Sequence, residues 1–324
     1  MTRVVVLVNE VPELTPIMAT TLIGLGCARR WPTWFVGVSD VAWVGGRLVG
    51  RGVRAADEPS TAFVARAPGA EQARVELGSG DLLLLRTNPA RDPDRAMEHK
   101  AALHLAVMAR DQGVTVLNDP ESLERVGSKL FLLELGEDVR PRQVVSASLA
   151  DLRAFADAED GPVVLKPLWG TRGIGVVKVD AGDAAGLEAA AGELLADGHV
   201  VAQEYLPEAP AGDVRVLMLE GAPITVDGHR AAVRRVPAPG EFRSNVHLGG
   251  TPAPAAWSEA LETVSGKVGP ELARRGIFLA GLDVVGRKVV EVNVFAPGGF
   301  QNAGQQAGVD FLEPVLDALE RRLG

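Results

Sequence analysis

The chain has 324 residues, of which 47% are hydrophobic and 23% charged, as expected for a globular protein with a large core and two or three domains. Its formal net charge of −9 argues against nucleic acid and anionic membrane as partners. A single cysteine, Cys27, excludes an intramolecular disulfide and a cysteine metal cluster, which suits a reducing cytoplasm.

The first 119 residues predict an α/β domain with a parallel sheet, because apolar strands alternate with helical segments. The apolar run at 4–8 is too short for a signal peptide and reads as a core strand. Residues 55–80 predict irregular structure. The remaining predicted elements are a helix at 16–30, strands at 34–38, 47–54 and 82–85, a helix at 94–111 and a strand at 114–117.

Asn118-Asp119-Pro120 predicts a helix start, with Asp119 as the cap and Pro120 at the first helical position. We place a domain boundary there, and we expect the helix to carry Lys129 and to end near Gly136. The following segment predicts a strand at 144–145, a helix that Ser148 caps, strands at 163–166, 176–179 and 200–203, and a helix at 184–195. An antiparallel set of strands is then predicted at 213–219, 224–226 and 231–236. A loop at 237–254, a helix at 256–275, a hairpin at 281–293, a glycine-rich loop and a helix at 311–323 complete the chain.

Lys166 lies inside an apolar strand, although lysine is almost never fully buried without a partner. A loop with Gly170, Gly173 and Gly175 follows, and glycines let backbone N–H groups approach phosphate oxygens. The order GxxGxG is neither the P-loop nor the dinucleotide pattern, and alone it is most often a plain turn. Together, the lysine and the loop predict a phosphate grip with a mobile lid, to which Arg172 adds a positive charge.

Gln203-Glu204-Tyr205-Leu206 ends a strand abruptly. Exposed backbone N–H and C=O groups beside apolar side chains can bind an adenine ring. Taken alone, however, this segment favours an ordinary strand end.

Four arginines and a single acid lie between His229 and Arg243, an unusual local excess in an acidic chain. Arginine's planar fork suits carboxylate and phosphate oxygens, and here the arginines alternate with apolar residues, so we favour anion binding over a solvated face. Gly298 and Gly299 could present N–H groups to a second anion. Arg86 follows the four-leucine strand, where open α/β sheets place ligand contacts.

The hairpin around Gly286 carries Asp283 in one strand and Glu291 and Asn293 in the other. Glu291 and Asn293 are two residues apart, so they share a face. A three-residue loop would place Asp283 opposite Glu291 on that face, whereas a two-residue loop would place it on the other. Two carboxylates and an amide oxygen suit Mg²⁺. The alternative is a hairpin with one solvated face.

Other catalytic chemistries find little support. There is no GxSxG motif, Cys27 lies in an apolar helical stretch typical of a core residue, and the spacing of His247 does not indicate a base.

In this order the segments resemble the ATP-grasp ligases, and among them bacterial glutathione synthetase. The likeness runs from about Asn118 to the C-terminus, and ribosomal-protein glutamate ligases are similar as well. The matching pieces are Asn118-Asp119-Pro120, Lys129-Leu130-Phe131, Val164-Leu165-Lys166-Pro167, Gln203-Glu204-Tyr205-Leu206-Pro207, Asp213-Val214-Arg215-Val216-Leu217, Gly240-Glu241-Phe242-Arg243-Ser244-Asn245, Gly281-Leu282-Asp283 and Glu291-Val292-Asn293.

The resemblance implies an α/β (α+β) ATP-grasp fold. A parallel-sheet domain at 1–119 would precede a two-part module with antiparallel sheets, whose small subdomain with the lid spans 120–200 and whose C-terminal subdomain with the metal site spans 201–324.

The resemblance also implies roles for the candidate residues. Lys129 and Lys166 would hold the ATP phosphates, with Gly170, Arg172, Gly173 and Gly175 in the lid, while Gln203, Glu204, Tyr205 and Leu206 would bind adenine and Asp213 the ribose. Asp283, Glu291 and Asn293 would hold Mg²⁺, with Mn²⁺ as the alternative. Arg235 and Arg243 would be catalytic, Arg235 facing the transferred phosphate, and Arg243, Asn245, Gly298, Gly299 and Arg86 would meet the acid.

The implied activity is ATP-dependent ligation of a carboxylate to an amine through an acyl phosphate, by a cytoplasmic homo-oligomer acting on small molecules. The substrate side departs from the family, because Ala296-Pro297-Gly298 replaces a Ser-Pro-Thr run and residues 300–306 carry no charge. Two alternatives therefore stay open. One is a ligase that adds an amino acid to a peptide or protein, and the other is a nucleotide-binding regulatory protein without turnover.

Overall fold

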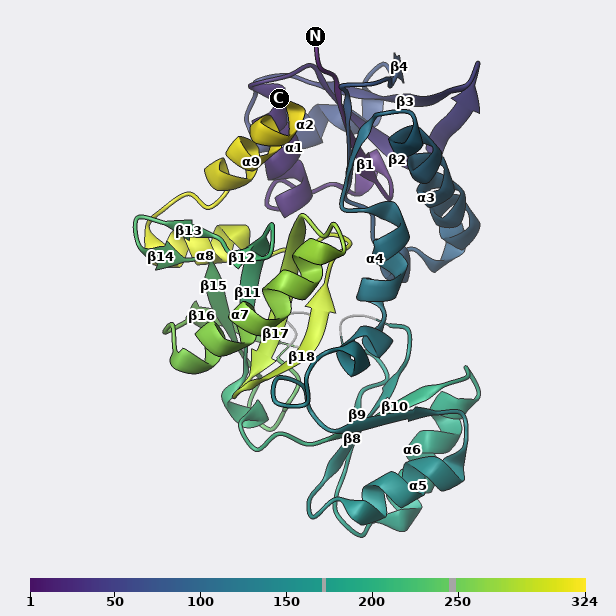
Figure 1. Ribbon diagram of the computed structural model, residues 1–324, viewed down its shortest axis with the longest axis vertical. Coiled ribbons are helices and arrows are strands. Elements are labelled where there is room, and N and C mark those ends of the chain that lie inside the picture. The colour runs from purple at the N-terminus through teal and green to yellow at the C-terminus, as the bar shows by residue number, and fades with distance from the viewer. Residues whose placement is uncertain (171–172, 245–248) are drawn as a thin grey trace.

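The computed structural model describes residues 1–170, 173–244 and 249–324. The molecule is elongated, with an N-terminal sheet at one end, a four-stranded sheet at the other and an antiparallel sheet between them (Figure 1). Both chain termini lie at the end that holds the N-terminal sheet (Figure 1). The helices are α1 Ala19–Ala28, α2 Ser60–Arg66, α3 Ala96–Asp111, α4 Pro120–Gly127, α5 Leu149–Ala158, α6 Ala184–Leu195, α7 Glu259–Arg274, α8 Phe300–Ala307 and α9 Glu313–Leu323.

The N-terminal sheet has the strand order β4-β3-β2-β1-β5-β6. Strands β2, β1, β5 and β6 are parallel, as predicted, but β3 and β4 add an antiparallel edge. The reason is a two-residue turn at Gly45 and Gly46, whose φ angles of 61° and 80° suit a tight hairpin. The strands are β1 Val4–Val8, β2 Thr33–Val44, β3 Arg47–Ala55, β4 Ala73–Glu76, β5 Leu82–Leu85 and β6 Thr115–Leu117.

Residues 55–80 are more regular than predicted, because they contain α2 and β4. The edge strand β4 pairs with β3, and Phe63 of α2 is fully buried against Phe35 of the sheet, with ring centroids 4.7 Å apart. Such long-range contacts override the weak local preference of an alanine- and glycine-rich segment.

Helices cover both faces of the N-terminal sheet, with α3 on one face and α1, α2 and α9 on the other. The chain end therefore returns to the first domain, where α9 packs on α1. Arg30, at the end of α1, pairs with Glu313, Asp317 and Glu320 of α9 at 2.8–2.9 Å.

The four-stranded sheet has the order β7-β10-β8-β9, is antiparallel, and packs against α5 and α6 in a core of its own. Its strands are β7 Gln143–Ser146, β8 Val163–Pro167, β9 Val177–Val179 and β10 Val200–Glu204. The predicted boundary at residue 200 lies at the first residue of β10, and the division into subdomains stays a prediction. Ser148 is the cap residue of α5 but makes no side-chain cap bond.

The central sheet has the order β16-β15-β11-β17-β18, with β12 beside β11. It contains β16 where a loop was predicted, and α8 replaces the predicted loop at 300–306. The strands are β11 Asp213–Leu219, β12 Ala222–Pro223, β15 Ala232–Val236, β16 Thr251–Pro254, β17 Leu279–Val285 and β18 Lys288–Asn293, and β13 Thr225–Val226 pairs with β14 His229–Arg230.

The helix expected to carry Lys129 ends earlier than predicted. Helix α4 stops at Gly127, and Ser128 has an extended backbone. Lys129 begins a separate 3₁₀ turn, Lys129–Glu134, for which the Ser128 side chain accepts a hydrogen bond from the backbone N–H of Leu130. The break places Lys129 at the edge of the cavities described below.

Asn118 fixes the end of the first domain to the central sheet. Its Nδ2 donates to the carbonyls of Leu279 and Val294 at 2.9 and 2.7 Å, and its Oδ1 accepts from the N–H groups of Phe278 and Leu279 at 2.8 Å. Four bonds on one buried side chain thus set where β17 starts.

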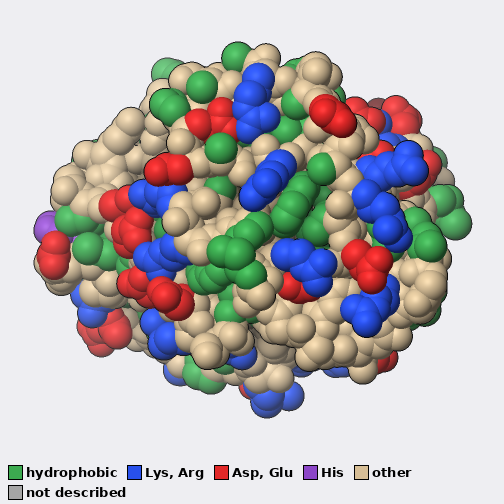
Figure 2. All heavy atoms as spheres, turned by 90° about the horizontal axis from the view of Figure 1, so that it is seen from above, with side chains coloured by type: hydrophobic (Ala, Val, Ile, Leu, Met, Phe, Trp, Pro, Cys, Tyr) green, Lys and Arg blue, Asp and Glu red, His purple; other side chains and the backbone are tan. Residues whose placement is uncertain are grey.

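The face seen from above in Figure 2 carries basic and acidic side chains interspersed, around a band of hydrophobic ones. This agrees with a diffuse acidic excess rather than a single-sign patch. Within the described part of the chain, every helix is too short or too polar to cross a membrane.

Candidate active site

Two cavities meet between the sheets. The inner cavity lies between the four-stranded and central sheets and measures about 130 Å³. The outer cavity, about 1200 Å³, lies beside it against the N-terminal domain. Lys129, Gly170 and Glu291 line both.

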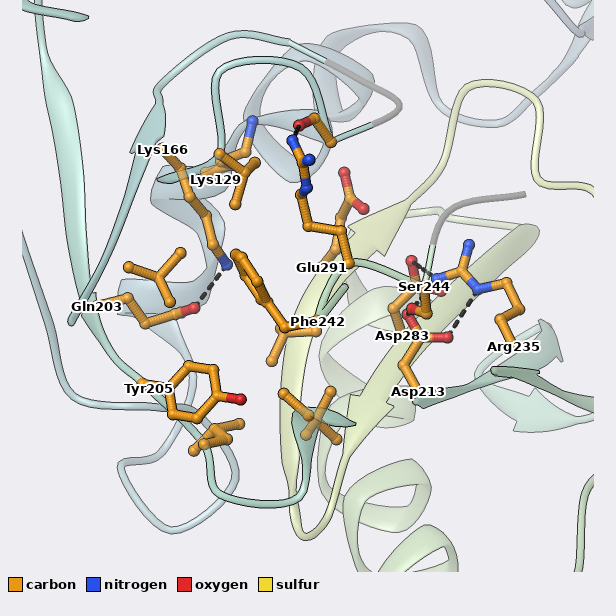
Figure 3. Close-up of a pocket in the computed structure, with 18 of the residues that line it drawn as sticks. Lys129, Lys166, Gln203, Tyr205, Asp213, Arg235, Phe242, Ser244, Asp283 and Glu291 are labelled. Atoms are coloured by element: carbon orange, nitrogen blue, oxygen red, sulfur yellow. Dashed lines mark hydrogen bonds and ion pairs between the residues drawn. The ribbon is translucent and has the colours of Figure 1, made fainter. Parts of the chain in front are cut away.

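The inner cavity gathers most of the residues that the sequence singled out. Figure 3 shows Lys166, Gln203 and Tyr205 on one side and Asp213, Arg235, Ser244 and Asp283 on the other, with Phe242 and Glu291 between them. The candidates on its walls are Lys129, Lys166, Gly170, Gly173, Gln203, Glu204, Tyr205, Leu206, Asp213, Arg235, Arg243, Asp283 and Glu291.

Five candidates lie elsewhere, and two lie outside the described residues. Arg86, Asn293, Gly298 and Gly299 line the outer cavity. Gly175 lines neither cavity, but its φ of 70° and the 3.3 Å that an added Cβ would leave to Pro167 both favour glycine. Arg172 and Asn245, with His247, lie outside the residues that the structure describes.

The two lysines reach the inner cavity from different elements. Lys166 Nζ donates to Gln203 Oε1 at 2.6 Å, and Gln203 donates in turn to Gln143 Oε1 at 3.0 Å. Burial, together with the charge of Lys129, lowers the pKa of Lys166 to about 8, against the opposing effect of Glu291. Lys129 Nζ donates to the carbonyls of Leu168 and Gly170, at 3.5 and 3.3 Å, and so holds the base of the glycine loop.

The hairpin turn differs from the predicted one. Val285 pairs with Lys288, so the turn contains only Gly286 and Arg287, and the three-residue loop is wrong. Gly286 has a φ of 57°, the left-handed conformation that such a tight turn requires.

Asp283 nevertheless lies directly opposite Glu291, so the predicted shared face is confirmed. A register shift between Asp283 and Val284 makes this possible, because Val290 is an extra residue of a β-bulge. Val290 and Glu291 consequently both line the inner cavity although they are adjacent in the chain. The bulge, and not the length of the turn, therefore places Asp283 and Glu291 on the same face of the hairpin.

Asp283 is buried, with 1% of its surface exposed, and both of its carboxylate oxygens have partners. Arg215 donates to its two carboxylate oxygens at 2.7 and 2.6 Å, Arg235 reaches Oδ2 at 2.7 Å, and Asn293 Nδ2 lies 3.3 Å from the same oxygen. Burial alone would raise the pKa of Asp283, but the two arginines outweigh it and hold the pKa well below its usual range.

Asp213 forms the other half of this ion-pair network. Both of its oxygens accept hydrogen bonds from Arg235, and Ser244 Oγ donates to Oδ2 at 2.7 Å. Burial and the charge of Asp283 raise the pKa of Asp213, against the opposing effect of Arg235. The carboxylate of Asp213 therefore orients Arg235 in this structure, and its contact with a ribose stays a prediction.

Glu291 contrasts with Asp283, because its carboxylate has no hydrogen-bond or ion-pair partner among the described residues. Burial and the charge of Asp283 raise the pKa of Glu291, partly offset by Lys129, Arg215 and Lys166. A half-buried, unpaired carboxylate beside two lysines is suited to a cation. Asp283, Glu291 and Asn293 thus supply an oxygen set that fits Mg²⁺.

One end of the inner cavity is apolar and suits a flat base. Its walls include Val164, Ile174, Leu206 and Phe242. Tyr205 packs edge-on against Phe242 with ring centroids 6.0 Å apart. The carboxylate of Glu204 points away to Arg142, at 2.8 Å, which leaves its backbone as the part that faces the cavity.

Arg243, in the loop that follows β15, reaches the glycine loop. Its Nη1 donates to the carbonyl of Gly173 at 3.2 Å, and its Nη2 pairs with Glu241 at 2.6 Å. The two loops on either side of the inner cavity are therefore in direct contact.

Arg86 is a buried charge without an acidic partner among the described residues. It is 4% exposed, and it donates to Thr20 Oγ1 at 3.3 Å and to the carbonyl of Pro297 at 3.1 Å. Burial lowers the pKa of Arg86 to about 10. Buried charges are normally paired, so an arginine in this state on a cavity wall is suited to an anionic ligand.

Two polar residues of the site were not predicted, Arg215 and Ser244. Both stand in segments that matched the family, but neither had a role there. Arg215 is the cross-strand partner of Asp283 in β11 and β17, and no local pattern indicates this pairing because the two residues are 68 apart in the chain. Ser244 follows Arg243 in the loop after β15, and no local pattern reveals its bond to Asp213.

Residues 128–308 match the family model of the prokaryotic glutathione synthetase ATP-grasp domain. The glutathione synthetase of Ralstonia nicotianae is 36% identical over 246 residues, which cover 75% of this chain and 72% of that protein. The chain belongs to the prokaryotic glutathione synthetase family. The enzyme of Agrobacterium fabrum is 31% identical over 254 residues, which cover 78% of this chain and 75% of that protein.

Solved structures agree with this fold. A D-cycloserine synthetase superposes with a TM-score of 0.66 at 16% identity and covers 99% of this chain and all of its own. The D-alanyl-alanine synthetase A of Vibrio cholerae superposes with a TM-score of 0.58 at 13% identity, and the match covers 99% of this chain and 98% of that chain. The protein is thus an ATP-grasp enzyme, an ATP-dependent ligase that forms amide bonds and uses ATP and Mg²⁺.

Proposed function

We propose that this ligase activates a carboxylate substrate as an acyl phosphate and transfers it to an amine, with ATP in the inner cavity and the other two substrates in the outer one. The observation that carries the proposal is the position of Glu291. Its unpaired carboxylate lines both cavities, beside two lysines, where a nucleotide phosphate and an acid would meet.

The nucleotide would lie with its base at the apolar end, against Tyr205 and Leu206 and the backbone of Glu204. Lys129 and Lys166 would hold its phosphates, and the glycine loop would fold over them. Among the described residues each lysine bonds only neutral oxygens, so neither ammonium has to break an ion pair with them to receive a phosphate.

Asp283, Glu291 and Asn293 would hold the metal. Bound Mg²⁺ would neutralise the triphosphate charge and orient the terminal phosphate. Arg215 and Arg235 occupy the oxygens of Asp283, so a metal has to share or displace them. An arginine released in this way is available to phosphate oxygens, which its planar fork suits.

The acid would enter the outer cavity. Arg86 would meet a carboxylate there, with Gly298 and Gly299 presenting backbone N–H groups, and Arg243 would approach it from the wall of the inner cavity. The role of Asn245, outside the described residues, stays a prediction. Gly299 stands at the start of α8, and a helix N-terminus favours negative charge.

The reaction would proceed in two transfers. A carboxylate oxygen attacks the γ-phosphorus, and the bond to the β-phosphate oxygen breaks to give acyl phosphate and ADP. The amine nitrogen then attacks the acyl carbon, and phosphate and a proton leave as the amide forms. Positioning and electrostatic stabilisation carry both steps, with Arg235 facing the transferred phosphate. Lid closure must exclude water, because water hydrolyses an acyl phosphate.

A second candidate is a ligase that adds an amino acid to a peptide or protein. The size of the outer cavity favours it, because about 1200 Å³ exceeds the 300–1,000 Å³ typical of small-ligand sites. The ATP-grasp ligase PsnB, of the same fold, is known in complex with a precursor peptide.

We also propose that the ligase works in the cytoplasm as a homo-oligomer on small molecules. The use of a single cysteine, Cys27, which is buried, suits a reducing compartment. Light scattering on the purified protein tests the oligomeric state, and a monomer at micromolar concentration would contradict it.

The experiment that tests the proposed function is ADP release with a panel of acids and amines, with mass spectrometry of the product. Formation of an amide that requires acid, amine and ATP together supports ligation. ATP binding without ADP release for any pair would favour the regulatory alternative.

A further inference from the structure

Three large apolar side chains of the outer cavity are open to solvent. Ile17 is 64% exposed, Met18 37% and Trp169 65%, and all three line this cavity. Ile17 and Met18 precede α1 in the N-terminal domain, whereas Trp169 follows β8 at the start of the glycine loop. Apolar side chains left open on the wall of a site mark surface that a ligand covers.

The cavity that they line leads directly to the reaction centre. It shares Glu291 and Lys129 with the inner cavity, so a molecule seated in it can reach the place where phosphate and acid meet. Residues 300–302, which also line it, carry no charge. Ile17, Met18 and Trp169 therefore add exposed apolar contacts to a wall that also carries charged residues such as Glu13 and Lys100.

We propose that Ile17, Met18 and Trp169 select a substrate that carries an apolar side chain, an amino acid or a peptide with an aliphatic or aromatic residue. The inference rests on the proposed ligation and adds the chemical class of one of its substrates. The apolar side chain could belong to the acid or to the amine, and the contacts would be the same in both cases.

Kinetics of ADP release can separate these two sources. One arm varies the amine, from glycine to alanine to leucine, with γ-glutamylcysteine as the acid. The other arm varies the acid, from γ-glutamylalanine to γ-glutamylleucine, with glycine as the amine. We expect kcat/KM to rise at least about tenfold from the smallest to the largest side chain in one arm, as pocket contacts of a few methylenes produce.

A double variant then tests two of the three side chains. The double variant Ile17→Ser/Trp169→Ala should reduce that preference to within about twofold, mainly through KM, because it removes apolar contacts to the substrate side chain. The matched control is Met108→Ala, an exposed apolar residue of α3 that lines neither cavity, and it should keep the preference. Equal kcat/KM across both arms, or a preference that survives the double variant, overturns the proposal.

Binding provides a readout that needs no turnover. Leucine and γ-glutamylleucine, each added with a non-hydrolysable ATP analogue, should shift tryptophan emission to the blue in the wild type and not in Trp169→Phe, which keeps the four other tryptophans. A shift without ADP release would leave this inference standing and contradict ligation. No shift with either probe overturns this inference, even if ADP is released.

Discussion

Asp283 and Glu291 lie opposite each other across the β17–β18 hairpin, but only Asp283 is paired with cations. Arg215 and Arg235 bind its carboxylate, whereas that of Glu291 has no such partner among the described residues. The two carboxylates therefore differ in what their removal would do to the free protein, even though both are proposed metal ligands.

Glu291→Gln should lower the rate of ADP release by about 10²–10³-fold, the usual loss for one preorganised electrostatic contact. The melting temperature should stay the same or rise, because the substitution removes an unpaired carboxylate from a half-buried position. Coupled ADP assays and thermal denaturation measure the two effects. Near-normal turnover in the folded variant would refute the metal assignment.

Asp283→Asn should lower activity similarly but also destabilise the fold. It leaves Arg215 without its carboxylate partner, and losing one member of a buried pair costs about 3–5 kcal/mol. We expect a loss at the low end of this range, because Arg235 keeps its ion pair with Asp213 when Asp283 is neutralised. Urea denaturation measures the loss, and an unchanged free energy of unfolding would show that the arginines do not depend on Asp283.

The stability of Glu291→Gln relative to the wild type should depend on pH. Because the pKa of Glu291 is raised above the ordinary 4.5, this group stabilises the fold below that pH and loses the contribution as pH rises through the folded-state pKa. The melting temperature of the variant should therefore rise relative to that of the wild type between pH 4.5 and 7. A constant difference over this range would contradict the raised pKa.

Nucleotide affinity should fall above about pH 8. With its pKa lowered to about 8, Lys166 is charged below that pH and progressively neutral above it, so phosphate binding loses one cation. Lys166→Met should bind an ATP analogue more weakly and with a flatter pH profile between 7 and 9. Calorimetry of both proteins checks this, and parallel profiles would exclude Lys166 as the titrating group.

Arg86→Met should raise KM for the acid at least about tenfold and leave kcat nearly unchanged, as loss of a uniform binding contact does. The free protein should be as stable as the wild type or more so, because the variant removes a buried charge without an acidic partner. Arg91→Met, at a second arginine that lines the outer cavity, is the comparison. A marked fall in melting temperature for Arg86→Met alone would indicate a structural brace instead.

Much of the fold follows from local patterns. Apolar runs predicted β1, β5 and β11, and the cap and proline at Asp119 and Pro120 predicted the start of α4. What failed depends on distant contacts. The edge strand β4 forms against β3, and α8 forms in a glutamine-rich stretch that packs against the central sheet.

The candidate site likewise combines residues that the sequence indicated with features that depend on distant contacts. Residue types and their order indicated Lys166, Asp283 and Glu291. The turn length was wrong, and the shared face was still right, because the bulge at Val290 adds the residue that the turn lacks. Bulges depend on packing across the sheet, so spacing along the chain does not show them. Arg215 was missed for a similar reason, since its partner lies 68 residues away.

ADP release by the wild type and by Glu291→Gln, measured across a panel of acids and amines with mass spectrometry of the products, tests the account most directly. We predict ADP and an amide in equal amounts for at least one acid–amine pair, and a loss of both of about 10²–10³-fold in the variant. Equal turnover in the two proteins, or ADP without amide for every pair, would contradict the proposed ligation at this carboxylate.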